Sequence, residues 1–208
     1  MGKLTVTAFV SLDGVMQAPG GPKEDTGGGF KYGGWTAPFG NEELFASILQ
    51  WFSRAESFLL GRKTYKIFAD YWPKSTDPND PIAKPLNSLP KYVASKTLKK
   101  VGWNNSTLLK GNIVTAIRKL KTMEGGEIQV HGSSGLLQTL LKAQLIDEFR
   151  LMIFPVVLGK GKRLFGSGAT PVGLELVDSK RTATGVMIQV YRPAGVVRTG
   201  TIGEASPK

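Results

Sequence analysis

Between residues 128 and 141 the sequence passes from a β-branched strand pattern to a leucine-rich helical pattern through a short turn of glycine and serine. The first turn of a helix carries backbone N–H groups without partners inside the helix, and the helix dipole adds a partial positive charge there. Such a turn is a ready site for a phosphate group. A second turn of this kind lies at residues 61–65, after the apolar segment 58–60. Two such turns predict a ligand with more than one phosphate, of which a nucleotide cofactor is the simplest.

The composition is typical of a soluble globular protein whose chemistry does not depend on cysteine. The 208 residues suffice for one compact domain with a substantial core, and no run of about 18 apolar residues indicates a membrane span. The chain has no cysteine and one histidine, which excludes disulfides, thiolate catalysis and cysteine-based zinc sites. The first strand pattern begins at residue 3 without the layout of a signal peptide, so we expect a cytoplasmic protein.

The net charge of +11 is unevenly distributed along the chain. No acidic residue occurs between residues 81 and 123 or between residues 149 and 174, although both segments carry several lysines and arginines. A field of this sign favours polyanionic ligands, but a solvated basic surface explains it as well, and we expect that for most of these lysines. Nucleic acid is a disfavoured partner, because the sequence has no zinc finger, basic helix or aromatic-interleaved RNA-binding motif.

Strand and helix patterns alternate along the chain, which predicts an α/β fold with a largely parallel sheet. The predicted strands are residues 3–10, 57–60, 92–95, 106–109, 127–131, 148–155, 173–180 and 185–192. The predicted helices follow Asn41 up to residue 52, run from residue 63 or 64 to before Pro73, carry Ile113 to Leu120, and cover residues 134–144. A loop with nine glycines at residues 13–40 and an irregular proline-rich connection at 73–90 complete the pattern.

Five segments in this order resemble a known family: residues 11–14 (SLDG), 61–65 (GRKTY), 93–98 (VASKTL), 130–137 (VHGSSGLL) and 154–161 (FPVVLGKG). Their order and spacing resemble the dihydrofolate reductase fold, and more closely the reductase domain of the bifunctional deaminase-reductase of bacterial riboflavin biosynthesis. The resemblance implies a single dihydrofolate reductase-like domain over residues 1–193, a three-layer sandwich with a mostly parallel eight-stranded sheet and a C-terminal antiparallel hairpin. Residues 194–208 are small and polar and are predicted to form a disordered tail.

The resemblance also implies which residues hold an NADPH cofactor. They are Gly61, Arg62, Lys63 and Thr64 for the phosphates, Gly132, Ser133, Ser134, Gly135 and Leu136 for the pyrophosphate, Ser95 and Lys96 for the 2′-phosphate, and Phe154 and Val156 as an apolar floor under the nicotinamide. A hydroxyl and a cation at the strand end favour NADPH over NADH, because an NADH site usually offers a carboxylate to the ribose. The alternatives are plain helix caps at the two turns, solvent-exposed cations at 62–63 and a polar turn at 95–96.

On the substrate side, the resemblance places Asp13 and Gly14 at the mouth of the site. Asp13 is a candidate catalytic residue that orients the substrate or relays a proton, although an Asp-Gly turn alone explains both residues. Four aromatic residues are candidates for a flat substrate pocket, and at least two of them are expected to be core instead; they are Trp35, Phe39, Phe68 and Trp72. His131 is expected to be a strand-end residue rather than a catalyst.

One departure from the family pattern concerns the proton donor. Dihydrofolate reductases carry a carboxylate on the first helix, whereas alignment on Gly61 and Arg62 brings Phe45 to about that position, with Glu42 and Glu43 one turn earlier. Folate is therefore an unexpected substrate, the donor is unassigned, and water is a plausible source of the proton.

The function predicted from the sequence is an NADPH-dependent reductase that transfers a hydride to a C=N or C=O carbon of a small heterocyclic substrate. It resembles 5-amino-6-(5-phosphoribosylamino)uracil reductase, in which case Lys160 and Lys162 are candidates to meet a substrate phosphate. The family also implies a homodimer formed through the late strands. The alternatives are a non-catalytic module that binds NADPH or nucleic acid, and an enzyme of the same fold that acts on an unrelated carbonyl compound.

Overall fold

The computed structural model describes residues 2–75, 77–123, 125–167 and 169–203, and in this part of the chain eight strands form one sheet with helices on both faces. The strands are β1 (Lys3–Ser11), β2 (Ala55–Gly61), β3 (Lys91–Ala94), β4 (Ser106–Leu109), β5 (Glu127–His131), β6 (Glu148–Phe154), β7 (Leu174–Arg181) and β8 (Met187–Pro193). The α-helices are α1 (Glu42–Phe52), α2 (Arg62–Tyr71), α3 (Ala83–Ser88), α4 (Ile113–Met123) and α5 (Ser134–Lys142). Three short 3-10 helices are η1 (Gly27–Gly29), η2 (Ala37–Phe39) and η3 (Trp72–Lys74).

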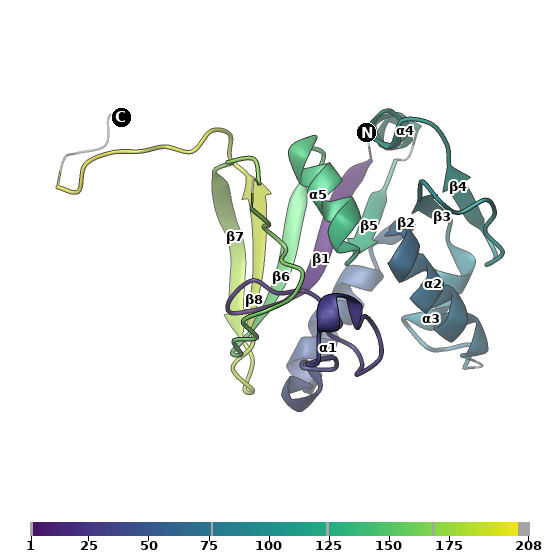
Figure 1. Cartoon of the computed structure of the whole chain (residues 1–208), viewed down its shortest axis with the longest axis horizontal. Coiled ribbons are helices and arrows are strands. Elements are labelled where there is room, and N and C mark those ends of the chain that lie inside the picture. Colours follow the sequence, from purple (N-terminus) through teal and green to yellow (C-terminus); the bar gives the residue numbers. More distant parts are fainter. Residues whose placement is uncertain (1, 76, 124, 168, 204–208) are drawn as a thin grey trace.

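The strand order across the sheet is β4-β3-β2-β5-β1-β6-β8-β7, which can be followed from right to left in Figure 1. Strands β1 to β6 pair in parallel with their neighbours, whereas β8 is antiparallel to β6 and β7 is antiparallel to β8. Parallel strands need crossover connections, and helices supply all of them except the one from β3 to β4, which is the loop at residues 95–105. The predicted fold class, a mostly parallel eight-stranded α/β sheet with a C-terminal antiparallel hairpin, is confirmed.

Both faces of the sheet are covered because alternate residues of each strand point to opposite sides. On one side, Leu4 and Val6 of β1 belong to a core cluster with residues of α4 and α5. On the other side, Phe58 and Leu60 of β2 pack with residues of α1, α2 and α3. Burial on both faces leaves nearly every residue of β1, β5 and β6 buried, including the polar residues Thr5, Gln129 and Arg150.

The face toward α1 also buries an ion network. Arg150 on β6 donates from Nη1 and Nη2 to the two oxygens of Glu127 on β5, at 2.6 and 2.7 Å, and from Nε to Glu148 at 3.0 Å. All three residues are buried. Buried charges persist only when they are paired and hydrogen-bonded, and here each side of the guanidinium faces a carboxylate.

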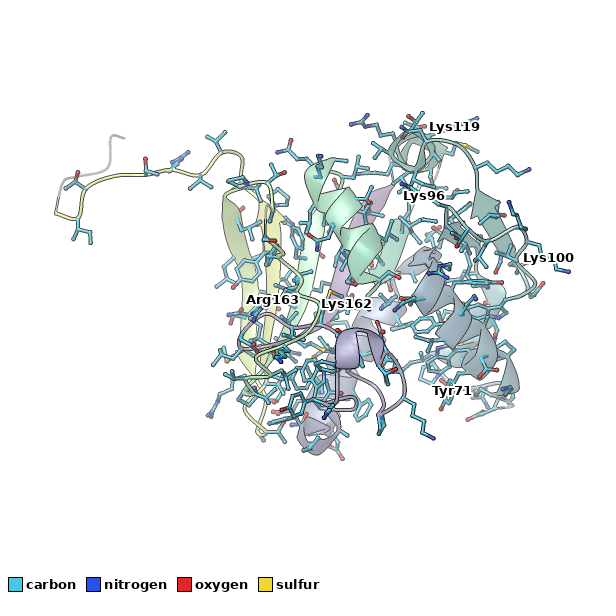
Figure 2. The ribbon with its side chains drawn as sticks, in the orientation of Figure 1. Tyr71, Lys96, Lys100, Lys119, Lys162 and Arg163 are labelled. Carbon is cyan, nitrogen blue, oxygen red and sulfur yellow. The ribbon has the colours of Figure 1, made fainter. Side chains whose placement is uncertain are left out.

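Two cations of the acid-free segment are buried, so the expectation of a solvated basic surface is wrong at these positions. Lys91 donates to the carbonyls of Leu86 and Leu89 at 2.7 and 2.8 Å, and burial lowers its pKa to about 8. Lys121 is buried as well and donates to Asp147 at 2.6 Å. Lys100 and Lys119, by contrast, lie on the exposed outer side of the molecule (Figure 2).

The boundaries predicted from the sequence agree with the observed ones within about three residues for the strands, but one helix was not predicted. The predicted irregular connection at residues 73–90 contains η3 and α3. Helix α3 begins where the Asp80 carboxylate accepts from the backbone N–H groups of Ile82 and Ala83, at 2.8 and 2.9 Å. Pro85 lies in the first turn of this helix, where no backbone N–H is required.

The end of the chain leaves the domain after β8. Residues 194–203 have no regular secondary structure and extend away from the sheet (Figure 1). The predicted disordered tail at residues 194–208 stays a prediction, and its last five residues, 204–208, lie outside the described residues. Among the described residues, no helix has the length and apolar character needed to cross a membrane.

Candidate functional site

A large cavity of about 1810 Å³ opens at the carboxyl ends of the parallel strands. The ends of β2, β3 and β5 reach it, as do the residues that follow each of them. Ligands of open parallel sheets bind outside the carboxyl ends of the strands, so this is where a site is expected. Two parts of the wall differ in chemistry. The turn end comprises residues 61–64, 95–96 and 132–136, and the aromatic end comprises the apolar side chains of α1 and α2 with Trp72 and Ile82.

The two glycine-containing turns of the turn end are joined to each other through Ser133. Its hydroxyl accepts a hydrogen bond from the backbone N–H of Gly61 at 3.1 Å and lies 2.5 Å from the hydroxyl of Thr64. A Cβ atom at Gly61 would lie 2.5 Å from Ser133 Oγ, so only glycine fits there without a shift. Ser133 itself has a φ of +67°, following Gly132 at +71°. A left-handed serine is strained, and such strain concentrates at functional sites.

Because Ser133 bridges the turns, its side chain does not cap the helix that it precedes. No side chain caps α5, and none caps α2, which begins directly after Gly61. The first-turn N–H groups of both helices therefore lack side-chain acceptors, and residues 62–64 and 134–136 all line the cavity. The alternative reading of residues 133–134 as a plain helix cap is wrong. Free N–H groups at two converging helix starts, beside the cations of Arg62 and Lys63, fit the phosphates of a dinucleotide.

The end of β3 adds a hydroxyl and a cation to the turn end. Ser95 and Lys96 line the cavity, and the Ser95 hydroxyl accepts from the backbone N–H groups of Thr97 and Leu98 at 3.1 and 3.0 Å. The polar-turn alternative for residue 95 is therefore also realised. Sequence reasoning missed a third strand-to-helix connection, residues 111–114 before and within α4, which lines the same cavity. The signal was present, since Asn112 is a capping residue whose side chain accepts from Thr115 N at 3.1 Å.

The glycine-rich loop reaches the cavity through Asp25, which sequence reasoning also missed. Its carboxylate pairs with Lys63 of α2 at 3.0 Å and with Lys162 of the loop after β6. Burial alone would raise the pKa of Asp25, but the hydrogen bonds from the two lysines lower it to about 2. Lys162 lies centrally beside this loop in Figure 2 and lines the cavity, whereas Lys160 is exposed and is not among the lining residues. Only Lys162 of this pair therefore lines the cavity, and a substrate phosphate at these lysines stays a prediction.

The aromatic end is formed by side chains of α1 and α2. Of the four aromatic residues singled out in the sequence, Phe68 and Trp72 line the cavity. Trp35 and Phe39 do not: both pack edge-on against Phe154, with ring centroids 5.3 and 5.7 Å away. The expectation that at least two of the four belong to the core is met by these two. Phe154 is fully buried and contributes to the cavity wall, as predicted for the apolar floor.

Three further predicted site residues lie outside the cavity wall: Asp13, Gly14 and Val156. The Asp13 carboxylate accepts from Ser11 Oγ at 2.7 Å and from the backbone N–H groups of Leu158 and Gly159 at 3.0 and 2.9 Å. Burial opposes ionisation, but these hydrogen bonds lower its pKa to about 2, so Asp13 is a poor proton donor. It anchors the loop after β6, and its predicted role in orienting the substrate stays a prediction.

Gly14 and Val156 also serve the backbone of this region. Gly14 has a φ of +85°, which favours glycine, and its carbonyl accepts from Leu164 N at 3.0 Å. The Val156 carbonyl accepts from Leu12 N at 2.9 Å, and its side chain packs into the core cluster that contains Phe154. Both residues therefore fix the loops beside the cavity, and their contact with a ligand stays a prediction.

His131, the single histidine of the chain, lies where the two ends of the cavity meet. Its ring stacks on Phe52 of α1 with a centroid distance of 4.6 Å and an interplanar angle of 24°. Burial and the nearby charge of Arg150 lower its pKa to about 3, so the ring is neutral at physiological pH. The sequence expectation of a strand-end residue is correct for its position, but the residue also forms part of the cavity wall.

An eight-stranded sheet in this order, with a cavity at its carboxyl edge, defines the class of dihydrofolate reductase-like α/β proteins. The sequence model of the RibD C-terminal domain matches residues 2–188, and the chain belongs to this family. The resemblance inferred from the five sequence segments is thereby confirmed.

A relative in Bacillus subtilis (strain 168), the uncharacterized protein YyaP, is 35% identical over 141 residues, which are 67% of this chain and 74% of YyaP. Among solved structures, a protein of Shewanella sp. PV-4 named for riboflavin biosynthesis matches with a TM-score of 0.71 at 22% identity, covering 92% of this chain and 98% of that one. Dihydrofolate reductase of Enterococcus faecalis, complexed with NADP(H), matches with a TM-score of 0.60 at 13% identity over 93% and 97% of the two chains. At these identities the structures share the fold, and together with the family they point to an oxidoreductase.

Proposed function

We propose that the protein is an NADPH-dependent reductase that transfers a hydride to a C=N or C=O carbon of a small heterocyclic substrate. The observation that carries the proposal is the convergence of two uncapped helix N-termini, those of α2 and α5, on one cavity at the sheet edge. NADPH carries a pyrophosphate and a 2′-phosphate, so it has enough phosphate groups to occupy more than one such turn. The family membership and the NADP(H) bound by the Enterococcus faecalis relative in fold support the same choice.

The residues of the turn end divide the cofactor between them in this proposal. Backbone N–H groups at the starts of α2 and α5, with Arg62 and Lys63, bind the phosphates, and Ser133 holds the two turns at a fixed separation. Ser95 and Lys96 at the end of β3 bind the 2′-phosphate and so favour NADPH over NADH. When bound, NADPH supplies a hydride from C4 of its nicotinamide ring.

The chain then has to orient the substrate and the cofactor rather than provide a strong acid. Asp25 is ionised at neutral pH because its pKa is about 2, and His131 is neutral because its pKa is about 3. Neither group therefore holds a proton that it readily donates at neutral pH. We propose that water supplies the proton that completes the reduction.

Two measurements test the function. Calorimetric titration of the purified protein should show NADPH binding that is tighter than NADH binding. Ser133→Ala should weaken NADPH binding by about tenfold, because the two turns lose their bridge and one hydrogen bond to a strained backbone is worth about 1 kcal/mol or more. Ser88→Ala is the matched control, since that hydroxyl only bonds the Lys84 carbonyl on the exposed side of α3. Absence of heat with either coenzyme would contradict the proposal.

The reaction itself is tested by following NADPH oxidation with candidate substrates, among them the phosphoribosylaminopyrimidine of riboflavin biosynthesis and uncharged ring compounds with a carbonyl group. Binding of NADPH without oxidation of any of them would favour a non-catalytic NADPH-binding module. A salt-dependent affinity for DNA in the absence of NADPH binding would favour the nucleic-acid alternative, because phosphate contacts by lysines weaken steeply with salt.

We also propose a homodimer formed through the last strands. Strand β7 is at the edge of the sheet, and all eight of its residues are exposed. Leu176 and Val177 on this strand are 51% and 41% exposed. An exposed edge strand with apolar side chains is a template for pairing with another chain. Sedimentation analysis should give twice the monomer mass, and Leu176→Lys should shift the equilibrium toward monomer.

A further inference from the structure

The hydrogen bonds behind His131 define which ring nitrogen carries its proton. Gln129, two residues earlier on β5, donates from its amide nitrogen to the Trp51 carbonyl at 2.6 Å and to the Glu127 carboxylate at 2.5 Å. Both partners are acceptors only, because Glu127 is ionised in its pair with Arg150. The amide oxygen of Gln129 is therefore the atom that lies 3.0 Å from His131 Nε2. An oxygen acceptor at this distance requires a proton on Nε2.

A neutral imidazole with its proton on Nε2 has an acceptor lone pair on Nδ1. No hydrogen bond to Nδ1 is present among the described residues, and His131 lines the cavity. Stacking on Phe52 and contact with Phe58, at 4.6 and 5.7 Å between centroids, fix the plane of the ring. The ring is thus held by its faces and by Nε2, while Nδ1 remains able to accept a hydrogen bond from a bound molecule.

The neighbouring strand provides a second polar group without a partner. Thr7 of β1 is the register partner of His131, and the Thr7 residue also lines the cavity. Its hydroxyl is buried and makes no hydrogen bond within the described part of the chain. A buried hydroxyl left unpaired is energetically unfavourable, so such a group is expected to have a partner when a ligand is bound. Thr7 and His131 thus place a hydroxyl and a ring acceptor side by side on one face of the sheet.

The helices that line the cavity beside this pair present apolar side chains, whereas Arg150, the register partner of Thr7 on β6, is buried and is not among the lining residues. The residues of α1 that line the cavity are all apolar, and α2 contributes no charged side chain beyond its first turn; these residues are Leu44, Phe45, Ile48, Trp51, Phe52, Ile67, Phe68 and Tyr71. The charged residues of the wall come from the glycine-rich loop, the first turn of α2, the end of β3 and Lys162. A phosphorylated sugar therefore meets no cation at the aromatic end. Transfer of an unpaired charge to such a surface is costly, so the aromatic end favours an uncharged molecule.

We propose that Thr7 and His131 form the polar recognition point of the substrate site, and that the substrate is an uncharged, mainly apolar ring compound with one N–H or O–H group that donates to His131 Nδ1. This assignment rests on the proposed reductase function, and it replaces a phosphorylated substrate with a neutral one. Thr7 supplies a second hydrogen bond to the same polar group or to an atom next to it.

Two model compounds test the recognition point directly. 1-Naphthol and 1-methoxynaphthalene share the same rings, but only the first has an O–H group. Because the chain has one histidine, 15N labelling of histidine gives an unambiguous NMR signal for each ring nitrogen. The free protein should show the proton on Nε2, and 1-naphthol should shift the Nδ1 resonance whereas 1-methoxynaphthalene should not. A proton on Nδ1, or equal responses to the two compounds, would overturn the assignment.

Substitutions at His131 and Thr7 then test whether these two side chains cause the preference for a ligand with an O–H group. Wild type should bind 1-naphthol about three- to tenfold more tightly than 1-methoxynaphthalene, as one hydrogen bond predicts. His131→Phe keeps a ring to stack on Phe52, and Thr7→Val keeps the shape of the side chain; each should reduce this ratio toward one. A ratio that persists in both variants, or no binding of either compound to wild type, would contradict the proposal. NADPH titration of wild type is read separately, so that failure of the reductase proposal is distinguished from failure of this one.

Discussion

At its turn end the cavity is formed by backbone, whereas at its aromatic end it is formed by side chains from elements far apart in the sequence. Gly61 and Ser133 belong to turns that directly follow strands, and the strands place them next to each other by parallel pairing. Phe52, Phe68 and Phe154 come from α1, α2 and β6, which share no local motif. The turn end is maintained by local backbone geometry, whereas the aromatic end depends on the packing of the whole face toward α1.

We expect the largest effect at Arg150, because its buried ion network is part of the packing on which the aromatic end depends. Arg150→Met leaves the buried Glu127 without its cation, which should lower the free energy of unfolding by about 3–5 kcal/mol. Because Glu127 also orients Gln129, the proton position on His131 should change with it. Denaturant unfolding and the histidine NMR signals measure both consequences.

The double variant Glu127→Gln with Arg150→Met is the control for the buried charge. It removes both partners and should recover part of the stability that Arg150→Met loses. Asp70→Asn, at an exposed pair with Lys74, should change stability by less than about 0.5 kcal/mol. Unchanged stability in Arg150→Met would show that the aromatic end does not rely on this network.

The turn end is tested at Gly61, where the effect should fall mainly on binding. Gly61→Ala places a methyl group within 2.5 Å of Ser133 Oγ and 2.7 Å of Ser133 Cβ, so one of the two turns has to move. We expect NADPH affinity to fall at least about tenfold and stability to fall by about 1–3 kcal/mol. Gly102→Ala is the control, because a Cβ there meets nothing within 4 Å and Gly102 is not among the residues that line this cavity. Equal affinities of the two variants would contradict the bridged-turn geometry.

The difference between the turn end and the aromatic end also explains which features could be predicted from the sequence. Strand-turn-helix patterns are local, so the sheet, four of the five α-helices and the turn residues Gly61 to Thr64 and Gly132 to Leu136 could be located from the sequence. Helix α3 was missed because Pro85 within it, with Pro81 and Pro90 on either side, is usually read as a sign of irregular structure. The anchoring role of Asp13 could not be read from its place in a family motif, because its partners Leu158 and Gly159 lie more than a hundred residues away in the sequence.

Asp25 and Thr7 show which kind of site residue could not be found from the sequence. Asp25 matters because two lysines from different elements meet it, and no spacing in the sequence records that meeting. Thr7 reads as an ordinary polar residue of a strand, and its importance depends on the absence of a hydrogen-bond partner for a buried hydroxyl. Such features depend on tertiary packing, which local patterns do not encode.

Asp25 connects the glycine-rich loop to the turn end, and its removal should separate stability from binding. Its pKa of about 2 is below the ordinary value of 3.8, so its contribution to stability is fully present above about pH 4 and is lost as pH falls through about 2. Asp25→Asn should remove this part of the pH dependence, measured by chemical denaturation of both proteins from about pH 5 to about pH 2.

The same substitution frees Lys63 and Lys162 for an anionic ligand. NADPH affinity should therefore rise by about two- to fivefold at low salt, measured by calorimetry. Asp13→Asn is the comparison, because the pKa of Asp13 is also about 2 but its carboxylate lies outside the cavity wall. It should lose the same kind of acid-dependent stability without a change in NADPH affinity. A gain in affinity in both variants would indicate a general charge effect.

The smallest effect is expected at the outer part of the turn end, where a single exposed cation discriminates between coenzymes. Lys96 is exposed and lines the cavity beside Ser95, so its charge is partly screened by water. Lys96→Ala should weaken NADPH binding by about three- to fivefold and leave NADH binding unchanged, because only NADPH carries the 2′-phosphate. Lys100→Ala removes an exposed lysine from the outer side of the same region (Figure 2) and should affect neither coenzyme. Equal losses for NADPH and NADH in Lys96→Ala would place the 2′-phosphate elsewhere and leave the specificity of the turn end to its backbone.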